Sequence, residues 1–107
     1  MGKTVISVDG RFEWDEDKSR INKDIHGLYF DEILLAFDDP YLLEMYDETY
    51  STLEETRYRG LAELQGFIIL YLSYTELVSG RTRIISARLA EPTEEREYYE
   101  WRKNFIT

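Results

Sequence analysis

At the start of the chain, the pattern of apolar and polar positions changes near Trp14 from alternating to helical. Thr4–Val8 alternates weakly, which predicts a short edge strand before a turn at Asp9-Gly10. Four residues then follow at steps of four, three and four, which places them on one face of a predicted helix: Trp14, Lys18, Ile21 and Ile25. Asp15 is suited to cap this helix, and Gly27 is suited to end it in a left-handed conformation.

A second short helix is predicted from Asp31 to Phe37, where apolar residues are again spaced for one helical face. The residues expected to pack inward are Phe30, Ile33, Leu34 and Phe37. Asp38-Asp39-Pro40 then ends the helix, because proline cannot continue it. Tyr41–Tyr46 reads as a strand, although its Leu-Leu-Glu sequence is equally compatible with a helix.

The second half of the chain has the pattern of a β-meander. Arg57–Leu64 alternates imperfectly, Gln65-Gly66 turns the chain, and Phe67–Thr75 is almost entirely apolar or β-favouring. The latter segment is expected to be a central strand that is buried on both faces. After a further turn at residues 78–80, Arg81–Ala90 is predicted to be the next strand.

A C-terminal helix is predicted after Pro92, with Thr93 as its N-cap and glutamates in its first turn. Tyr98, Trp101 and Phe105 recur at helical spacing and are expected to pack on the sheet. The predicted fold is α+β, with two N-terminal helices, an antiparallel meander sheet of three to four strands and a C-terminal helix packed on the sheet. Residues 1–107 are expected to form a single domain.

Composition excludes several kinds of site. The chain has no cysteine and one histidine, His26, which excludes disulfides and argues against a metal centre built from thiolates or imidazoles. Four carboxylates near Asp15 are typical of a helix start, where they complement the dipole, so neither a metal nor another cofactor is expected. No run of about 18 apolar residues and no signal-peptide core occurs, which predicts a cytoplasmic protein that does not enter a membrane.

The net charge of −9 is unfavourable for binding nucleic acid, but it is unevenly distributed. Residues 1–50 carry 13 acidic and five basic residues, whereas residues 51–107 carry nine and eight. Within residues 57–88 the five cations are all arginine: Arg57, Arg59, Arg81, Arg83 and Arg88. Arginine is suited to phosphate because its planar fork donates two parallel hydrogen bonds, although solvated arginines paired with surface carboxylates would explain the same composition.

Four segments carry a resemblance to a known family. The first comprises Phe12-Glu13-Trp14-Asp15, Lys18, Asn22, His26-Gly27 and Phe30, and the second is Phe37-Asp38-Asp39-Pro40. The third runs from Glu55-Thr56-Arg57-Tyr58 into the strand that ends at Tyr74-Thr75. The fourth is Arg83-Ile84-Ile85-Ser86-Ala87-Arg88 with Ala90, Glu94 and Tyr98. Over about residues 12–99, these segments resemble the BrnT family in their order and spacing.

The resemblance implies a fold similar to that of the RelE-like ribonuclease toxins. It further implies a toxin of a type II toxin–antitoxin system that cleaves RNA and blocks translation. The implied partner is a BrnA antitoxin, which carries a ribbon-helix-helix part. Operator DNA would then be contacted only indirectly, through the antitoxin.

Metal-independent RNA cleavage needs a base for the 2′-OH, an acid for the leaving 5′ oxygen and cations for the phosphate. Arg57 and Arg88 are the first candidates for the cations. In an unbroken strand Arg83 and Arg88 would lie on opposite faces, so either a β-bulge intervenes or one of them has a structural role. Arg88 is preferred because Ser86 on its face leaves room for a ligand.

The acid and base have two candidates in this sequence. Glu55 is a candidate general base or a residue that orients Arg57, and a surface glutamate is the competing interpretation. His26 is a candidate acid or base because imidazole exchanges protons near neutral pH, although a helix C-terminus also suits a plain imidazolium. Arg83, Lys18, Arg59 and Tyr98 are the further candidates for RNA contacts. For Tyr98, a core role is equally compatible with the pattern.

Two functions from different classes therefore follow from the sequence. The first is a ribonuclease toxin that uses Arg57 and Arg88 on phosphate. The second is a catalytically inactive relative that binds the antitoxin and acts as a partner or corepressor, an interpretation favoured by the acidity of the chain. A generic acidic interaction domain is disfavoured by the family resemblance.

Overall fold

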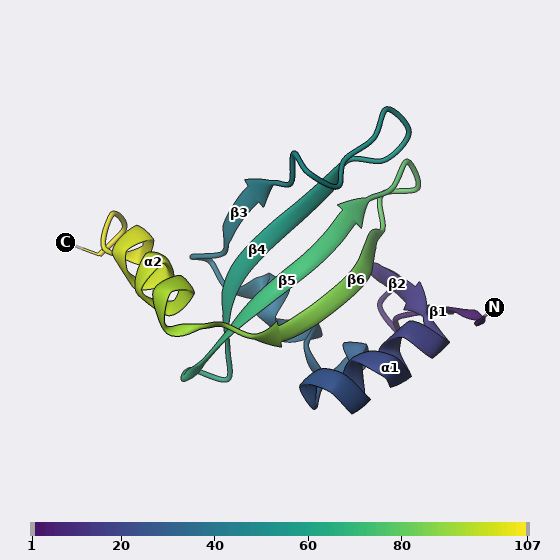
Figure 1. The fold of residues 1–107 in the computed structure, drawn as a ribbon, viewed down its shortest axis with the longest axis horizontal. Coiled ribbons are helices and arrows are strands. Elements are labelled where there is room, and N and C mark those ends of the chain that lie inside the picture. The colour runs from purple at the N-terminus through teal and green to yellow at the C-terminus, as the bar shows by residue number, and fades with distance from the viewer. Residues whose placement is uncertain (1, 107) are drawn as a thin grey trace.

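The computed structural model describes residues 2–106 and places six strands in one mixed sheet, in the order β1-β2-β6-β5-β4-β3 (Figure 1). The strands are β1 (Thr4–Ile6), β2 (Phe12–Asp15), β3 (Leu43–Tyr46), β4 (Arg57–Leu64), β5 (Ile68–Glu76) and β6 (Thr82–Leu89). The helices are α1 (Glu16–His26) and α2 (Pro92–Arg102), with two 3₁₀ turns, η1 (Phe30–Glu32) and η2 (Leu34–Asp38). The N-terminal strands and α2 lie at opposite ends of the long axis (Figure 1).

The α+β class is confirmed, but the predicted sheet of three to four strands is wrong. β4, β5 and β6 do form an antiparallel meander, with β3 added antiparallel to β4. The hairpin of β1 and β2 extends the other side of the sheet, because β2 pairs with β6 in parallel. The sequence analysis missed β2 because its four residues, including Trp14, coincide with the start of the helical pattern.

The ends of α1 agree with the prediction. The Asp15 side chain accepts hydrogen bonds from the backbone N–H groups of Asp17 and Lys18, and Gly27 adopts a left-handed conformation with φ 79°. The Asp15 pKa is lowered by the same backbone hydrogen bonds, which favour its charged form. Both capping residues therefore act as their sequence positions predicted.

The buried face of α1 differs from the prediction. Ile21 and Ile25 are 53% and 68% exposed, whereas Ser19 and Asn22 are buried. The Asn22 amide accepts from Ala87 N at 3.1 Å and donates to Ala87 O at 2.8 Å. Asn22 thus hydrogen-bonds to the edge of β6 as a neighbouring strand would. The helix directs this polar side chain toward the sheet because the backbone N–H and C=O groups of Ala87 need hydrogen-bonding partners.

The second N-terminal helix is also corrected, since residues 30–38 form η1 and η2 rather than an α-helix. In a 3₁₀ turn every third side chain points the same way. Phe30, Ile33 and Ala36 obey this period and are completely buried, while Leu34 and Phe37 are only partly buried.

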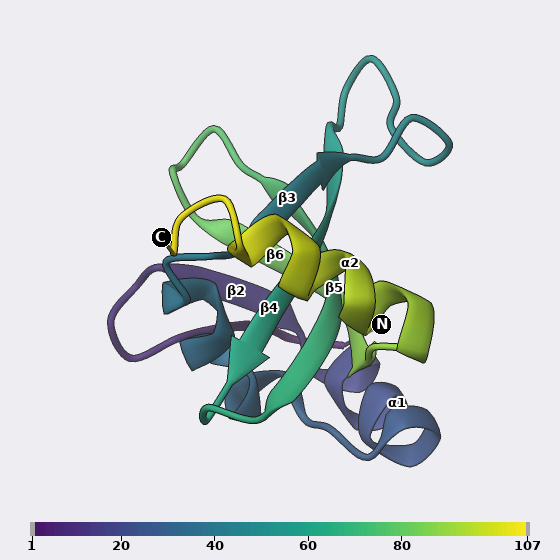
Figure 2. The ribbon, with the colours of Figure 1, turned by 90° about the vertical axis from the view of Figure 1, so that its left-hand side faces the viewer.

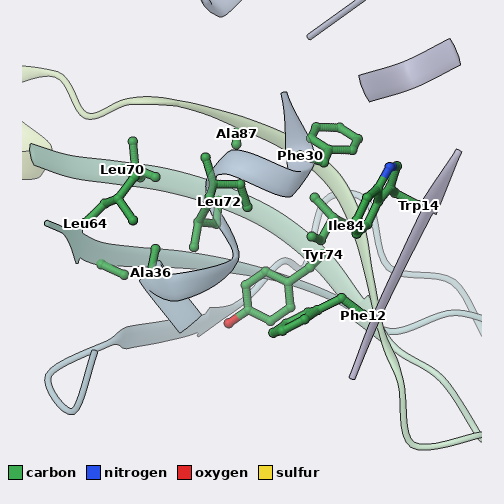
Figure 3. Close-up of a cluster of buried hydrophobic side chains, with 12 residues drawn as sticks. Phe12, Trp14, Phe30, Ala36, Leu64, Leu70, Leu72, Tyr74, Ile84 and Ala87 are labelled. Carbon is green, nitrogen blue, oxygen red and sulfur yellow. The ribbon is translucent and has the colours of Figure 1, made fainter. Parts of the chain in front are cut away.

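The main core lies between these turns and one face of the sheet (Figure 3). The strands contribute side chains that alternate along β4, β5 and β6: Ala62, Leu64, Leu70, Leu72, Tyr74, Ile84 and Ala87. Figure 3 shows Phe12 and Trp14 closing one end of this cluster and Leu64 and Leu70 lying at the other. The apolar alternation thus buries most of one sheet face and directs the alternate side chains to the opposite face.

α2 covers one end of that opposite face, as predicted for the C-terminal helix (Figures 1 and 2). Its buried Tyr98 packs with Leu61 of β4 and Ile69 of β5. The N-cap is Glu91 rather than the predicted Thr93, because Pro92 occupies the first helical position. Phe105 lies beyond the end of the helix, where its ring contacts Trp101 and Tyr41.

Candidate functional site

Four arginines share the sheet face that α2 leaves open. Strand register places Arg57 opposite Thr75 and Arg59 opposite Ser73. On β6, Arg83 lies opposite Thr75 and Arg88 opposite Tyr71. Residues directly opposite each other point to the same face of a sheet, so Arg57, Arg59, Arg83 and Arg88 lie on one face, which we call the arginine face.

A β-bulge makes this arrangement possible. The register passes from Ser73 opposite Ser86 to Tyr74 opposite Ile84, so Ile85 is an extra residue of β6. Because the alternation reverses at an extra residue, Arg83 and Arg88 reach the same face, which a regular strand would prevent. The sequence analysis gave a bulge or a structural role for one arginine as the two alternatives, and the bulge is present.

The arginines surround small polar side chains. Thr75 separates Arg57 from Arg83 in one row across the strands, so the Cα atoms of these arginines are about 10 Å apart. Ser73 and Ser86 form the next row, beside Arg59. The centre of the arginine face therefore consists of short polar side chains, and Thr75 among them is buried at 1% exposure.

Three of the four arginines are paired with carboxylates. Arg57 contacts Glu55 at 3.1 Å, and Arg83 contacts Glu13 of β2 at 2.5 Å. Arg88 donates to both carboxylate oxygens of Glu94, at 2.8 and 2.9 Å. The hydrogen bonds from Arg88 lower the Glu94 pKa, and those to Glu94 raise the Arg88 pKa.

Arg59 differs in its partner. Its Nη1 donates to the Tyr71 hydroxyl at 3.2 Å, which raises the Arg59 pKa, and within the described part of the chain it makes no ion pair. The Nε atoms of Arg57 and Arg59 are buried and have no acceptor among residues 2–106. Most buried N–H groups in folded proteins are hydrogen-bonded, so these two Nε atoms are exceptions to that rule.

His26 and Lys18 meet the arginine face at Ser86. Both line a pocket of about 190 Å³ between α1 and β6, together with Ile21, Ile25, Ile85 and Ser86. Ser86 belongs to this pocket and also to the arginine face. The fold therefore brings these two candidates, which are distant in sequence from the arginines, to the border of the same surface.

Tyr98 does not lie on this surface, and its expected RNA contact is corrected. The residue is completely buried, and its hydroxyl donates to Asp39 Oδ2 at 2.5 Å. Burial, followed by this hydrogen bond, raises the Tyr98 pKa. Tyr98 therefore belongs to the core, the alternative interpretation of its helical spacing.

The sequence analysis missed three residues that organise the arginine face. Glu13 was assigned to a helix start but pairs with Arg83 from β2. Tyr71 and Glu94 hold Arg88 from β5 and α2. Alternation along Phe67–Thr75 places Tyr71 on the face of the strand that points away from the buried leucines, and this is the only signal for Tyr71 in the sequence.

No metal centre is apparent in the described region: residues 2–106 contain no group of three or more His, Cys, Asp or Glu side chains arranged to hold an ion. The same residues contain no helix long and apolar enough to cross a membrane.

These features define a class: a small α+β protein whose exposed sheet face is lined with arginines suited to an anionic ligand. Residues 14–94 match the sequence model of a family described as ribonuclease toxin, BrnT, of type II toxin–antitoxin system. The chain belongs to this family, which confirms the resemblance, and it is accordingly a toxin-antitoxin toxin whose class implies an antitoxin partner.

A solved structure supports this assignment. The chain is similar to the ribonuclease toxin BrnT of Brucella abortus, with 25% sequence identity and a TM-score of 0.56. The alignment covers 73% of this chain and 92% of that chain. A search among curated proteins gave no match.

Proposed function

We propose that this toxin cleaves RNA without a metal ion, with the phosphate held on the arginine face. The observation that carries the proposal is the bulge at Ile85, which places Arg83 and Arg88 on the same sheet face as Arg57 and Arg59. The similar protein from Brucella abortus is a ribonuclease toxin, which agrees with this reaction.

In the proposed reaction, the ribose 2′ oxygen attacks the adjacent phosphorus and the bond to the 5′ oxygen breaks. A base accepts the proton of the 2′-OH, and an acid gives a proton to the leaving 5′ oxygen, so that a cyclic phosphate and a 5′-OH result. Arg57 and Arg88 stabilise the additional negative charge that develops on the phosphate oxygens. Arg59 and Arg83 contact neighbouring parts of the RNA backbone.

His26 and Glu55 are the proposed proton-transfer groups. His26 lines a pocket that also includes Ser86, a residue of the arginine face. Glu55 contacts Arg57 at 3.1 Å, where it both orients the guanidinium and presents a carboxylate to the edge of the face. Lys18 contributes a cation on the His26 side. The assignment of acid and base to these two residues is part of the proposal.

Growth on induced expression tests this function. Wild type is expected to arrest growth and degrade RNA, whereas Arg57→Ala and Arg88→Ala are expected to lose both effects. Arg96→Ala is the matched control, because Arg96 is an exposed arginine of α2. Cleavage of RNA by purified toxin is expected to persist in excess EDTA. Normal growth at high levels of folded wild-type toxin would refute the catalytic proposal.

A second candidate function is an inactive relative that binds the antitoxin and acts as a corepressor. The specific observation in its favour is that Arg57, Arg83 and Arg88 each have a carboxylate partner within the chain. An inactive relative would leave growth unaffected and still bind the antitoxin. We propose in either case that the antitoxin is of the BrnA type, with a ribbon-helix-helix part that contacts operator DNA.

A further inference from the structure

Tyr71 lies on β5 at the centre of the arginine contacts. The Arg88 Cζ atom lies 4.2 Å from the centroid of the Tyr71 ring, and the Tyr71 hydroxyl accepts the hydrogen bond from Arg59 Nη1. The side chain is partly buried. One residue therefore contacts two arginines from the strands on either side of it, through the ring in one case and the hydroxyl in the other.

Glu94 occupies the part of Arg88 that an RNA phosphate would need. Its two carboxylate oxygens accept from Nη1 and Nη2 of Arg88, the same paired geometry that phosphate oxygens adopt on a guanidinium. Glu94 also accepts from the backbone N–H of Glu91 at the start of α2. A phosphate can bind the fork of Arg88 only when this carboxylate gives way.

When a phosphate replaces Glu94 on Arg88, two other contacts to Arg88 remain. They are the Tyr71 ring and the Leu89 carbonyl, to which Arg88 Nη1 donates at 3.1 Å. A cation held over an aromatic face keeps its N–H groups free at the rim of the guanidinium. The ring contact is therefore compatible with phosphate binding, whereas the Glu94 contact competes with it.

We propose that Tyr71 is a positioning residue of the phosphate site and that Glu94 competes internally with RNA for Arg88. The Tyr71 ring holds the Arg88 guanidinium on the arginine face while Arg88 exchanges the Glu94 carboxylate for an RNA phosphate as its hydrogen-bond partner. The Tyr71 hydroxyl holds Arg59 on the same face. This inference rests on the proposed function for the identity of the ligand.

The test uses a short single-stranded RNA and its all-2′-deoxy counterpart, which lacks the attacking hydroxyl and reports binding alone. Tyr71→Leu is expected to weaken binding of the deoxy oligonucleotide about tenfold and to raise KM for RNA more than it lowers kcat. Tyr71→Phe keeps the ring and is expected to remain within about threefold of wild type. Glu94→Gln is expected to strengthen binding severalfold, because a neutral amide competes less well for a guanidinium.

Tyr41→Leu is the matched control. The Tyr41 ring contacts Arg102 of α2, with 4.9 Å from Cζ to the ring centroid, and Arg102 is not one of the four arginines of the site. Loss of that ring is expected to leave oligonucleotide binding unchanged. Thermal unfolding of each variant establishes that it is folded, and Tyr71→Thr, with a β-branched residue suited to a strand, is a second variant without the ring.

Failure of this inference is distinguishable from failure of the proposed catalysis. If wild type binds the deoxy oligonucleotide and Tyr71→Leu binds it weakly, the phosphate site stands even where no RNA is cleaved. Equal binding by folded Tyr71→Leu and wild type would overturn the role of Tyr71. Weaker binding by Glu94→Gln would overturn the competition, and absence of binding by wild type would overturn both.

Discussion

At the scale of single residues, Asp39 shows how one carboxylate joins segments that are distant in sequence. Its Oδ2 accepts from the Tyr98 hydroxyl at 2.5 Å and from Glu63 N at 2.8 Å, and its Oδ1 accepts from Tyr41 N at 2.9 Å. The sequence predicted only a helix stop at this Asp-Asp-Pro segment. Asp39 links α2 to β4 and to the segment before β3, which gives the buried Tyr98 a structural role.

Tyr98→Phe is expected to destabilise the protein by roughly 1–3 kcal/mol, because it removes a buried hydrogen bond to a charged acceptor. Urea unfolding measures this loss of free energy. Tyr99→Phe is the control, since Tyr99 is partly exposed and its ring packs edge-on against Tyr98. RNA binding by Tyr98→Phe is expected to equal that of wild type. A variant with unchanged stability and weakened RNA binding would restore Tyr98 to the RNA site.

At the scale of secondary-structure elements, local signals were sufficient for the ends of α1 and for the strands of the meander. Asp15 and Gly27 act on neighbouring backbone groups, so their effects are readable from sequence. The buried face of α1 was not readable, because the open edge of β6 selects Asn22 in place of the isoleucines. The bulge at Ile85 was left as an alternative, since Arg81–Ala90 is compatible with a regular strand until its pairing with β5 is known.

Asn22→Ala is expected to cost about 2–4 kcal/mol, because it leaves the buried N–H and C=O of Ala87 without their partner. The free energy from urea unfolding and faster hydrogen exchange of the Ala87 amide are the two measurements. Asn104→Ala is the matched control, since Asn104 is exposed and donates only to the Trp101 carbonyl. Equal costs for the two variants would contradict the pairing role of Asn22.

At the scale of the whole molecule, the acidic half and the arginine-rich half of the sequence form different parts of the fold. Residues 1–50, with a charge of −8, form the hairpin, α1, the 3₁₀ turns and β3, which surround the three central strands. Residues 51–106 contain those strands and all four arginines of the arginine face. The family could be inferred from four short motifs because they lie where elements begin, end or pair, but the shared face of the arginines required the three-dimensional register.

The same charge distribution leads to a prediction about the antitoxin, which we expect to be basic where it contacts residues 1–50. Opposite charges accelerate association, and salt screens them as the Debye length falls from about 10 Å at 0.1 M to about 3 Å at 1 M. The association rate constant of toxin and antitoxin, measured by stopped-flow mixing, is therefore expected to fall markedly with rising salt.

Removal of two exposed charges from the acidic half, by Asp24→Asn together with Asp31→Asn, is expected to slow association at low salt. Glu95→Gln with Glu97→Gln removes equal charge from exposed positions of α2 and is expected to have a smaller effect. A rate constant independent of salt, or equal slowing by both pairs, would contradict binding directed by the N-terminal half.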